Sequence, residues 1–88
     1  MTTLKLPARL THLEAQTCLL AMQQQAGTAG ELEVDASALE DFDSAALATL
    51  LALRRWAQAQ GRGLRVRQVP ARLAELVALY GVGELLPA

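Results

Sequence analysis

VDASALEDFDSAALA, residues 34–48 of the 88-residue chain, joins the end of one regular element to the start of another. Polar and apolar residues alternate over residues 31–35, which predicts a strand that ends in a turn. Farther along, Asp43 and Ser44 offer side-chain oxygens that can accept the first backbone N–H groups of a helix. The stretch therefore predicts a strand, a loop and a long helix from about residue 44 to residue 60.

The segments on either side continue this alternation of strands and helices. We expect further strands at residues 4–6 and 63–67, helices at residues 11–25 and 70–80, and a last apolar turn at residues 83–86. Thr11 and Glu14 fit a capping box, in which the Thr11 hydroxyl accepts the Glu14 N–H and the Glu14 carboxylate reaches back. The pattern predicts one α/β domain over residues 1–88, with a small sheet flanked by helices.

Composition narrows the chemistry that the chain can perform. Apolar residues make up 52% of the sequence, and the chain has one cysteine, Cys18, and one histidine, His12. A lone cysteine excludes an internal disulfide and cysteine-based metal motifs, and there is no glycine-rich loop with lysine for nucleotide phosphates. We therefore expect a protein that is not an enzyme and that uses no cofactor and no metal.

Two further observations bear on the class of protein. The N-terminus lacks the pattern of a signal peptide and no apolar run is long enough to span a membrane, so we expect a cytoplasmic protein.

Asp41 and Asp43 could in principle hold a divalent ion in a nucleotide-binding or nucleotide-hydrolysing enzyme. This alternative has the least support, because acidic side chains in a loop are usually solvated.

Charge is distributed unevenly along the chain. Up to Leu53 there are two basic and seven acidic residues, whereas from Arg54 onward there are six basic and two acidic residues. Such asymmetry can mark a surface for nucleic acid or anionic lipid. However, the arginines fall on several predicted elements, which favours solvated side chains and no direct binding of nucleic acid. These arginines are Arg54, Arg55, Arg62, Arg65, Arg67 and Arg72.

The long helix has two unlike faces at 100° per residue. The large residues form one stripe, which we expect to be core: Ala46, Leu47, Leu50, Leu53 and Ala57. The opposite face carries small residues and an indole: Ser44, Ala45, Ala48, Ala52, Arg55, Trp56 and Ala59. Alanine is the best helix former, so this face can be ordinary surface. Alternatively, it is a flat surface for a partner protein, with Arg55 and Trp56 as anchors.

Residues 34–48 resemble the signature of STAS domains, in which a strand ending in aspartate leads to an Asp-Ser or Asp-Thr pair that opens a helix. Residues 69–73 and 79–87 resemble the last helix and tail of this family, so the resemblance covers nearly the whole chain. It implies a small mixed sheet flanked by helices and a docking role for the helix that follows Asp43 and Ser44. The family's usual first strand, before Leu4, is missing.

Two groups of STAS proteins remain as alternatives. In anti-sigma-factor antagonists a second hydroxyl residue, which is phosphorylated by the partner kinase, follows the pair. Here Ala45 and Ala46 stand at the corresponding positions, so a phosphorylation switch would have to use Ser44. Binding to an anti-sigma-factor kinase is therefore the second interpretation.

The favoured group comprises the small STAS subunits of the Mla phospholipid transport system, which similarly have a lone Asp-hydroxyl pair. This resemblance implies an accessory subunit that binds the cytoplasmic ATPase of an inner-membrane ABC complex and is held at that membrane through its partner. The expected contacts are the residues of the small-residue helix face together with the capping carboxylate: Asp43, Ser44, Ala45, Ala48, Ala52, Arg55 and Trp56.

Overall fold

The predicted alternation of strands and helices is confirmed in the computed structural model, which describes residues 2–28 and 30–80. The strands are β1 (Thr2–Lys5), β2 (Arg9–Leu10), β3 (Leu32–Asp35), β4 (Asp41–Phe42) and β5 (Leu64–Arg67). The helices are α1 (Ala15–Gln25), α2 (Ser44–Ala59) and α3 (Ala71–Leu79). The expected turn at residues 83–86 lies outside the described residues.

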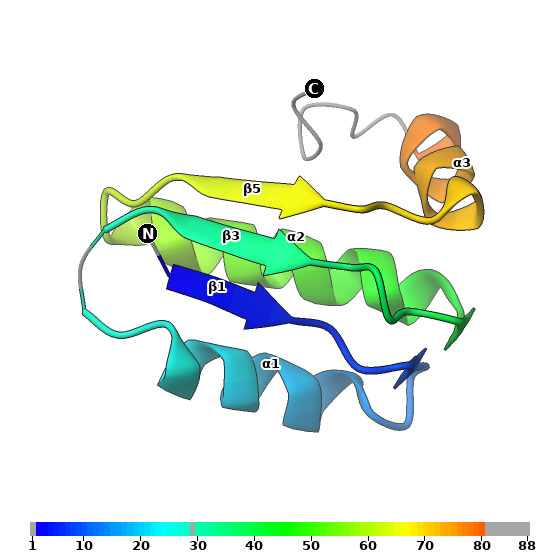
Figure 1. Ribbon diagram of the computed structural model, residues 1–88, viewed down its shortest axis with the longest axis horizontal. Coiled ribbons are helices and arrows are strands. Elements are labelled where there is room, and N and C mark those ends of the chain that lie inside the picture. Colours follow the sequence, from blue (N-terminus) through cyan, green and yellow to red (C-terminus); the bar gives the residue numbers. More distant parts are fainter. Residues whose placement is uncertain (1, 29, 81–88) are drawn as a thin grey trace.

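The main sheet has the strand order β1-β3-β5, and β1 and β5 each pair with β3 in parallel (Figure 1). Leu4, Val34 and Val66 stand in register across the three strands, and all three side chains are buried. The crossovers β1–α1–β3 and β3–α2–β5 place both helices over this buried face, where they contact each other. The pairs between described strands are all parallel, so the mixed sheet that the resemblance implied is not seen in this part of the chain.

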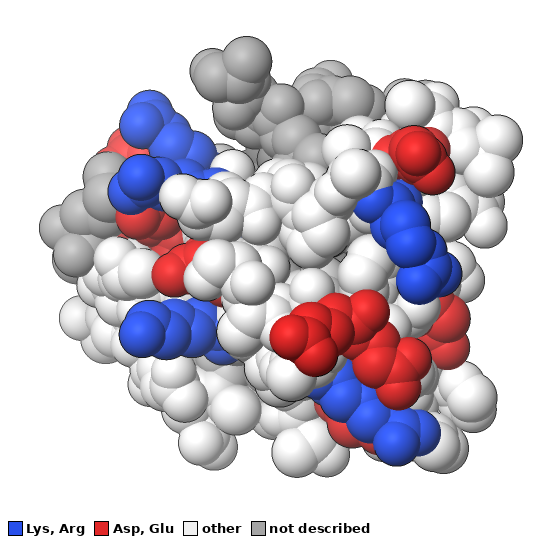
Figure 2. All heavy atoms as spheres, turned by 45° about the vertical axis from the view of Figure 1, so that its right-hand side comes forward, with Lys and Arg blue, Asp and Glu red and all other residues white. Residues whose placement is uncertain are grey.

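The opposite face of the sheet carries charged side chains. Lys5, Asp35 and Arg67 stand in register on it. Two residues earlier in their strands, Glu33 lies beside Arg65. Arg67 Nη1 and Glu33 Oε1 are 3.1 Å apart. Basic and acidic side chains stand side by side across the surface in Figure 2.

The start of α1 differs from the expectation. The helix begins at Ala15 instead of Thr11, because the four residues before it form a turn that leads out of β2. One half of the predicted capping box is present, since Glu14 Oε1 accepts the backbone N–H of Thr11 at 2.8 Å. The other half is absent: the Thr11 hydroxyl donates to the same Glu14 oxygen at 2.7 Å, and the Glu14 N–H bonds the Thr11 carbonyl.

The core lies between the sheet and the helices. The predicted stripe of α2 is buried throughout, and Leu50 and Leu53 are fully enclosed. At the far end, α3 packs against α2 and begins one residue after Pro70, which was expected as its first residue. Gly61 has φ = 69°, a left-handed conformation that glycine adopts without strain, and it stands two residues after the last residue of α2.

Arg62 is a correction to the view of the arginines as solvated surface. Its side chain is buried and donates to the carbonyl oxygens of Ala26, Gly27 and Gly30 at 2.6 to 3.1 Å. It also donates to the Gln60 side chain at 3.2 Å. Arg62 thereby joins the loop after α1 to the loop after α2.

Candidate partner-binding face

One carboxylate holds the start of α2. Asp43 Oδ1 accepts the backbone N–H of Ala45 at 2.8 Å, so the predicted helix cap is confirmed. Asp43 Oδ2 accepts the backbone N–H of His12 at 3.2 Å and lies 3.3 Å from the Nδ1 atom of its ring. The N–H of Ala45 holds the pKa of Asp43 below its ordinary value. A single side chain thus caps α2 and fixes the turn that precedes α1.

Ser44, the other member of the pair, faces solvent. It is the first residue of α2, whereas the capping position is occupied by Asp43. The two residues that follow turn progressively inward, since Ala45 is half-buried and Ala46 is fully buried. The hydroxyl of Ser44 is therefore accessible to solvent at the start of α2.

A hollow opens on α2 directly beyond Ser44. It encloses about 400 Å³ and is lined by Ser44, Leu47, Ala48 and Leu51 of α2 and by Tyr80, which follows α3. Ala48 is exposed, Leu51 is half-buried and Tyr80 is 57% exposed. The start of α2 thus presents an apolar depression with a phenol ring at its border.

The sequence matches a known protein family over nearly its whole length. A family model described as Mlab, STAS domain matches residues 1–87. The chain belongs to the STAS domain family. A comparison with curated proteins found no match. The recognised resemblance is therefore confirmed at the level of the family, and the Asp-Ser pair of this STAS domain stands at the start of α2.

Sequence reasoning found only part of the hollow in this STAS domain. Ser44 and Ala48 were expected on the binding face, whereas Leu51 and Tyr80 were missed. Leu51 could have been found, because it lies three residues after Ala48 and seven after Ser44 on the same side of a helix. Tyr80 could not, because it reaches α2 only through the packing of α3 against α2.

The second half of the expected face is less open. Ala52 is half-buried and Arg55 is exposed, as a surface contact requires. Trp56, expected as an anchor, is half-buried and packs against the core. The guanidinium of Arg62 lies 5.9 Å from the centroid of its ring. Part of the indole is therefore taken up by packing against the core. The most accessible section of the face is the one around Ser44 and Ala48.

Acidic side chains surround the start of α2. Asp41 is exposed and lies 3.8 Å from Arg9, which is also 3.4 Å from Glu14. Asp43 is already engaged by two backbone N–H groups. Within the ranges that the structure describes, no group of three or more histidine, cysteine, aspartate or glutamate side chains could hold a metal ion. Asp41 and Asp43 thus act as ion-pairing and capping groups in this STAS domain.

None of the described helices has the length and apolar content needed to cross a bilayer.

Proposed function

We propose that this STAS domain is a non-enzymatic accessory subunit of an inner-membrane phospholipid-transport ABC complex. It binds the cytoplasmic ATPase of that complex through the start of α2 and supports its assembly or activity. The domain is cytoplasmic and associates with the membrane through this partner. The observation that supports the proposal is the apolar hollow that begins at Ser44, on the helix that we expect to dock the partner.

The shape of the hollow suits a protein partner. Ser44 and Ala48 project little from α2, so a partner helix can approach the backbone closely, and an apolar side chain of that helix can fill the space next to Leu51 and Tyr80. Asp43 contributes by keeping the helix start rigid, because it is bonded to the turn before α1 as well as to α2. Arg55 extends the contact toward the end of the helix.

A pull-down from membrane and cytoplasmic fractions of the native host tests the proposal. The wild-type domain should recover an ABC ATPase together with its permease. Ser44→Arg and Ala48→Arg should each lose this recovery, because the arginine fills the hollow without disturbing the core. Ala74→Arg, at an exposed position of α3 that does not line the hollow, is the matched control and should behave as wild type.

Recovery of the ATPase by all four proteins would contradict the choice of face. Recovery of a sigma-regulating kinase without any ATPase would contradict the function. Circular dichroism of each variant separates loss of binding from loss of folding.

The exposure of Ser44 favours one alternative, an anti-sigma-factor antagonist. A phosphate on this hydroxyl would stand beside Asp41 and Asp43, and the added negative charge would repel a docked acidic partner. Intact-mass analysis after incubation with a candidate anti-sigma-factor kinase should then show one added phosphate, which Ser44→Ala abolishes. An unchanged mass would speak against this alternative.

A further inference from the structure

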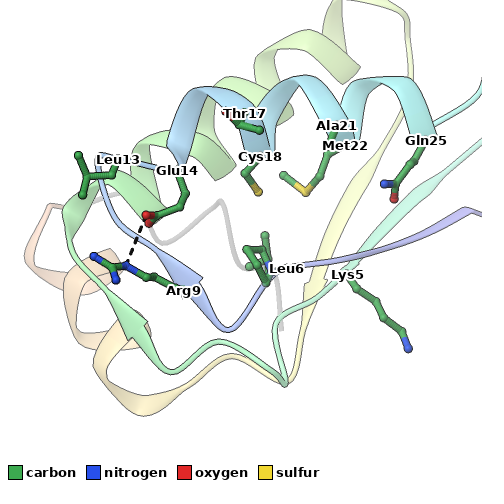
Figure 3. A pocket seen from close by; sticks show the side chains of 11 residues that line it. Lys5, Leu6, Arg9, Leu13, Glu14, Thr17, Cys18, Ala21, Met22 and Gln25 are labelled. Atoms are coloured by element: carbon green, nitrogen blue, oxygen red, sulfur yellow. Dashed lines mark ion pairs between the residues drawn. The ribbon is translucent and has the colours of Figure 1, made fainter.

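A second surface lies at the edge of the main sheet, away from the hollow on α2. The strand order β1-β3-β5 leaves β1 with a strand neighbour on one side only within the described residues. A groove of about 580 Å³ runs beside this edge, between α1 and the segment that leads from β1 to β2 (Figure 3). It shares no lining residue with the hollow on α2.

The backbone of β1 has hydrogen-bonding groups directed out of the sheet. Thr2 and Leu6 donate their N–H groups to carbonyl oxygens at the ends of β3, at 3.0 and 2.9 Å. Because successive residues of a strand point their backbone groups to opposite sides, those of Thr3 and Lys5 face the open edge. An extended peptide can pair with these groups as a further strand.

The groove supplies apolar contacts for such a strand. In Figure 3 the sulfur atom of Cys18 points into the space between α1 and β1, and the buried side chains of Leu6 and Met22 lie beneath it. Burial raises the pKa of the Cys18 thiol, so it remains neutral and apolar. Ala21 lines the same wall. A strand added beside β1 would turn every second side chain toward this wall.

The charged residues near the groove determine which side chains the added strand can carry on the face that points away from α1. Arg9 already lies 3.4 Å from Glu14 and 3.8 Å from Asp41. Lys5 points away from α1 in Figure 3, on the charged face of the sheet. Asp35 of β3 stands in register beside it, but within the described residues no ion pair of 4.0 Å or less engages Lys5, and its other side is the open edge. The side chains of an added strand on that face would stand next to Lys5, which favours acidic residues there.

We propose that the edge of β1 is a second binding site, and that it takes an extended segment of a partner protein in which apolar and acidic residues alternate. The segment adds to the sheet as a strand beside β1, with its apolar side chains against Cys18 and Ala21 and its acidic side chains next to Lys5. A second copy of this chain fits less well, because its own β1 brings another Lys5 and no acidic residue to the edge.

A short blocked peptide that alternates valine and glutamate is a direct probe. Its binding should slow alkylation of Cys18, the chain's one thiol, and protect the amides of Thr3 and Lys5 from hydrogen exchange. The same peptide with lysine in place of glutamate should bind about fivefold more weakly or not at all. Absence of amide protection, or equal binding of the two peptides, would overturn the proposal.

Variants locate the site. Ala21→Glu places a carboxylate in the groove and should abolish binding, whereas Gln24→Glu, at an exposed α1 position outside the groove, should not. Thr3→Pro removes an outward N–H while leaving the pairing with β3, and should also abolish binding without unfolding the domain. Ser44→Arg should leave peptide binding unchanged, so the site is tested independently of the proposed function. A dimer in light scattering that Ala21→Glu disperses would instead assign the edge to a second copy and overturn the proposal.

Discussion

At the scale of single residues, Asp43 connects two helices that are separated in the sequence. Its two carboxylate oxygens serve different segments, one the N–H of Ala45 in α2 and the other the N–H of His12 before α1. Asparagine can replace the oxygen that caps α2 but carries no charge. The capping role and the charge of this residue can therefore be measured separately.

We expect Asp43→Ala to lower Tm and Asp43→Asn to lower it less. The pKa of Asp43 is depressed in the fold, so its stabilising contribution is complete above the ordinary value of 3.8 and is lost as pH falls through the folded value. The Tm difference between wild type and Asp43→Asn should thus shrink below about pH 4. A difference that stays constant through this range would show that the charge contributes nothing.

Arg62 is a charged residue whose replacement should cost as much stability as the loss of a core side chain. Arg62→Ala leaves the carbonyl groups of Ala26, Gly27 and Gly30 without their charged donor, and should lower the free energy of unfolding by about 3 kcal/mol. Arg62→Lys should recover only part of this, because an ammonium lacks the planar set of donors. Urea unfolding measures both, with Arg65→Ala, on the exposed face of the sheet, as the control that should change little.

Sequence reasoning succeeded at this scale only where partners are close along the chain. The cap by Asp43 was predictable because Ala45 is two residues away. The bonds from Asp43 to His12 and from Arg62 to Gly30 join residues separated by 31 and 32 positions. No local pattern indicates such pairs, so Arg62 was assigned to the surface.

At the scale of elements, periodicity predicted α2 well because a single pattern governs its whole length. Every residue of the expected core stripe is buried, and the helix spans residues 44–59 against an expectation of 44–60. The start of α1 was predicted less well. Thr11 and Glu14 do bond each other, but they do so within a turn, and the same residue types favour either arrangement.

The two faces of α2 predict opposite effects of substitution. Leu50→Ala should lower the free energy of unfolding by about 3 kcal/mol, because its side chain is fully buried and a cavity would remain. Ala48→Arg should change it by less than about 0.5 kcal/mol, since Ala48 is exposed. Chemical denaturation compares the two. A large loss in Ala48→Arg would mean that this face is part of the core and unsuited to a partner.

At the scale of the whole molecule, folding cancels the charge asymmetry of the sequence. The parallel sheet places Glu33 beside Arg65 and Asp35 beside Lys5 and Arg67. The acidic and basic halves of the chain are therefore interleaved on one face, and the basic surface that the sequence allowed for is not formed there. Composition alone could not show this, because it depends on strand order and register.

Removing the two carboxylates of β3 should give this face of the sheet a net positive charge. In the double variant Glu33→Gln with Asp35→Asn, the cations Lys5, Arg65 and Arg67 lose their acidic neighbours. The variant should elute from a heparin column at higher salt than wild type, and the difference should vanish as ionic strength rises. Equal elution of the two proteins would show that the pairing does not suppress binding of anions.

The position of Arg62 also bears on whether two molecules of this domain can exchange a segment. The segment formed by β1, β2 and α1 precedes the loop that Arg62 binds, and the other described strands and helices follow it. If that loop straightened, the segment could leave its own sheet and complete the sheet of a neighbour, which is domain swapping. Because Arg62 donates to three carbonyl groups of the loop, we expect it to hold the loop bent and so to disfavour this exchange.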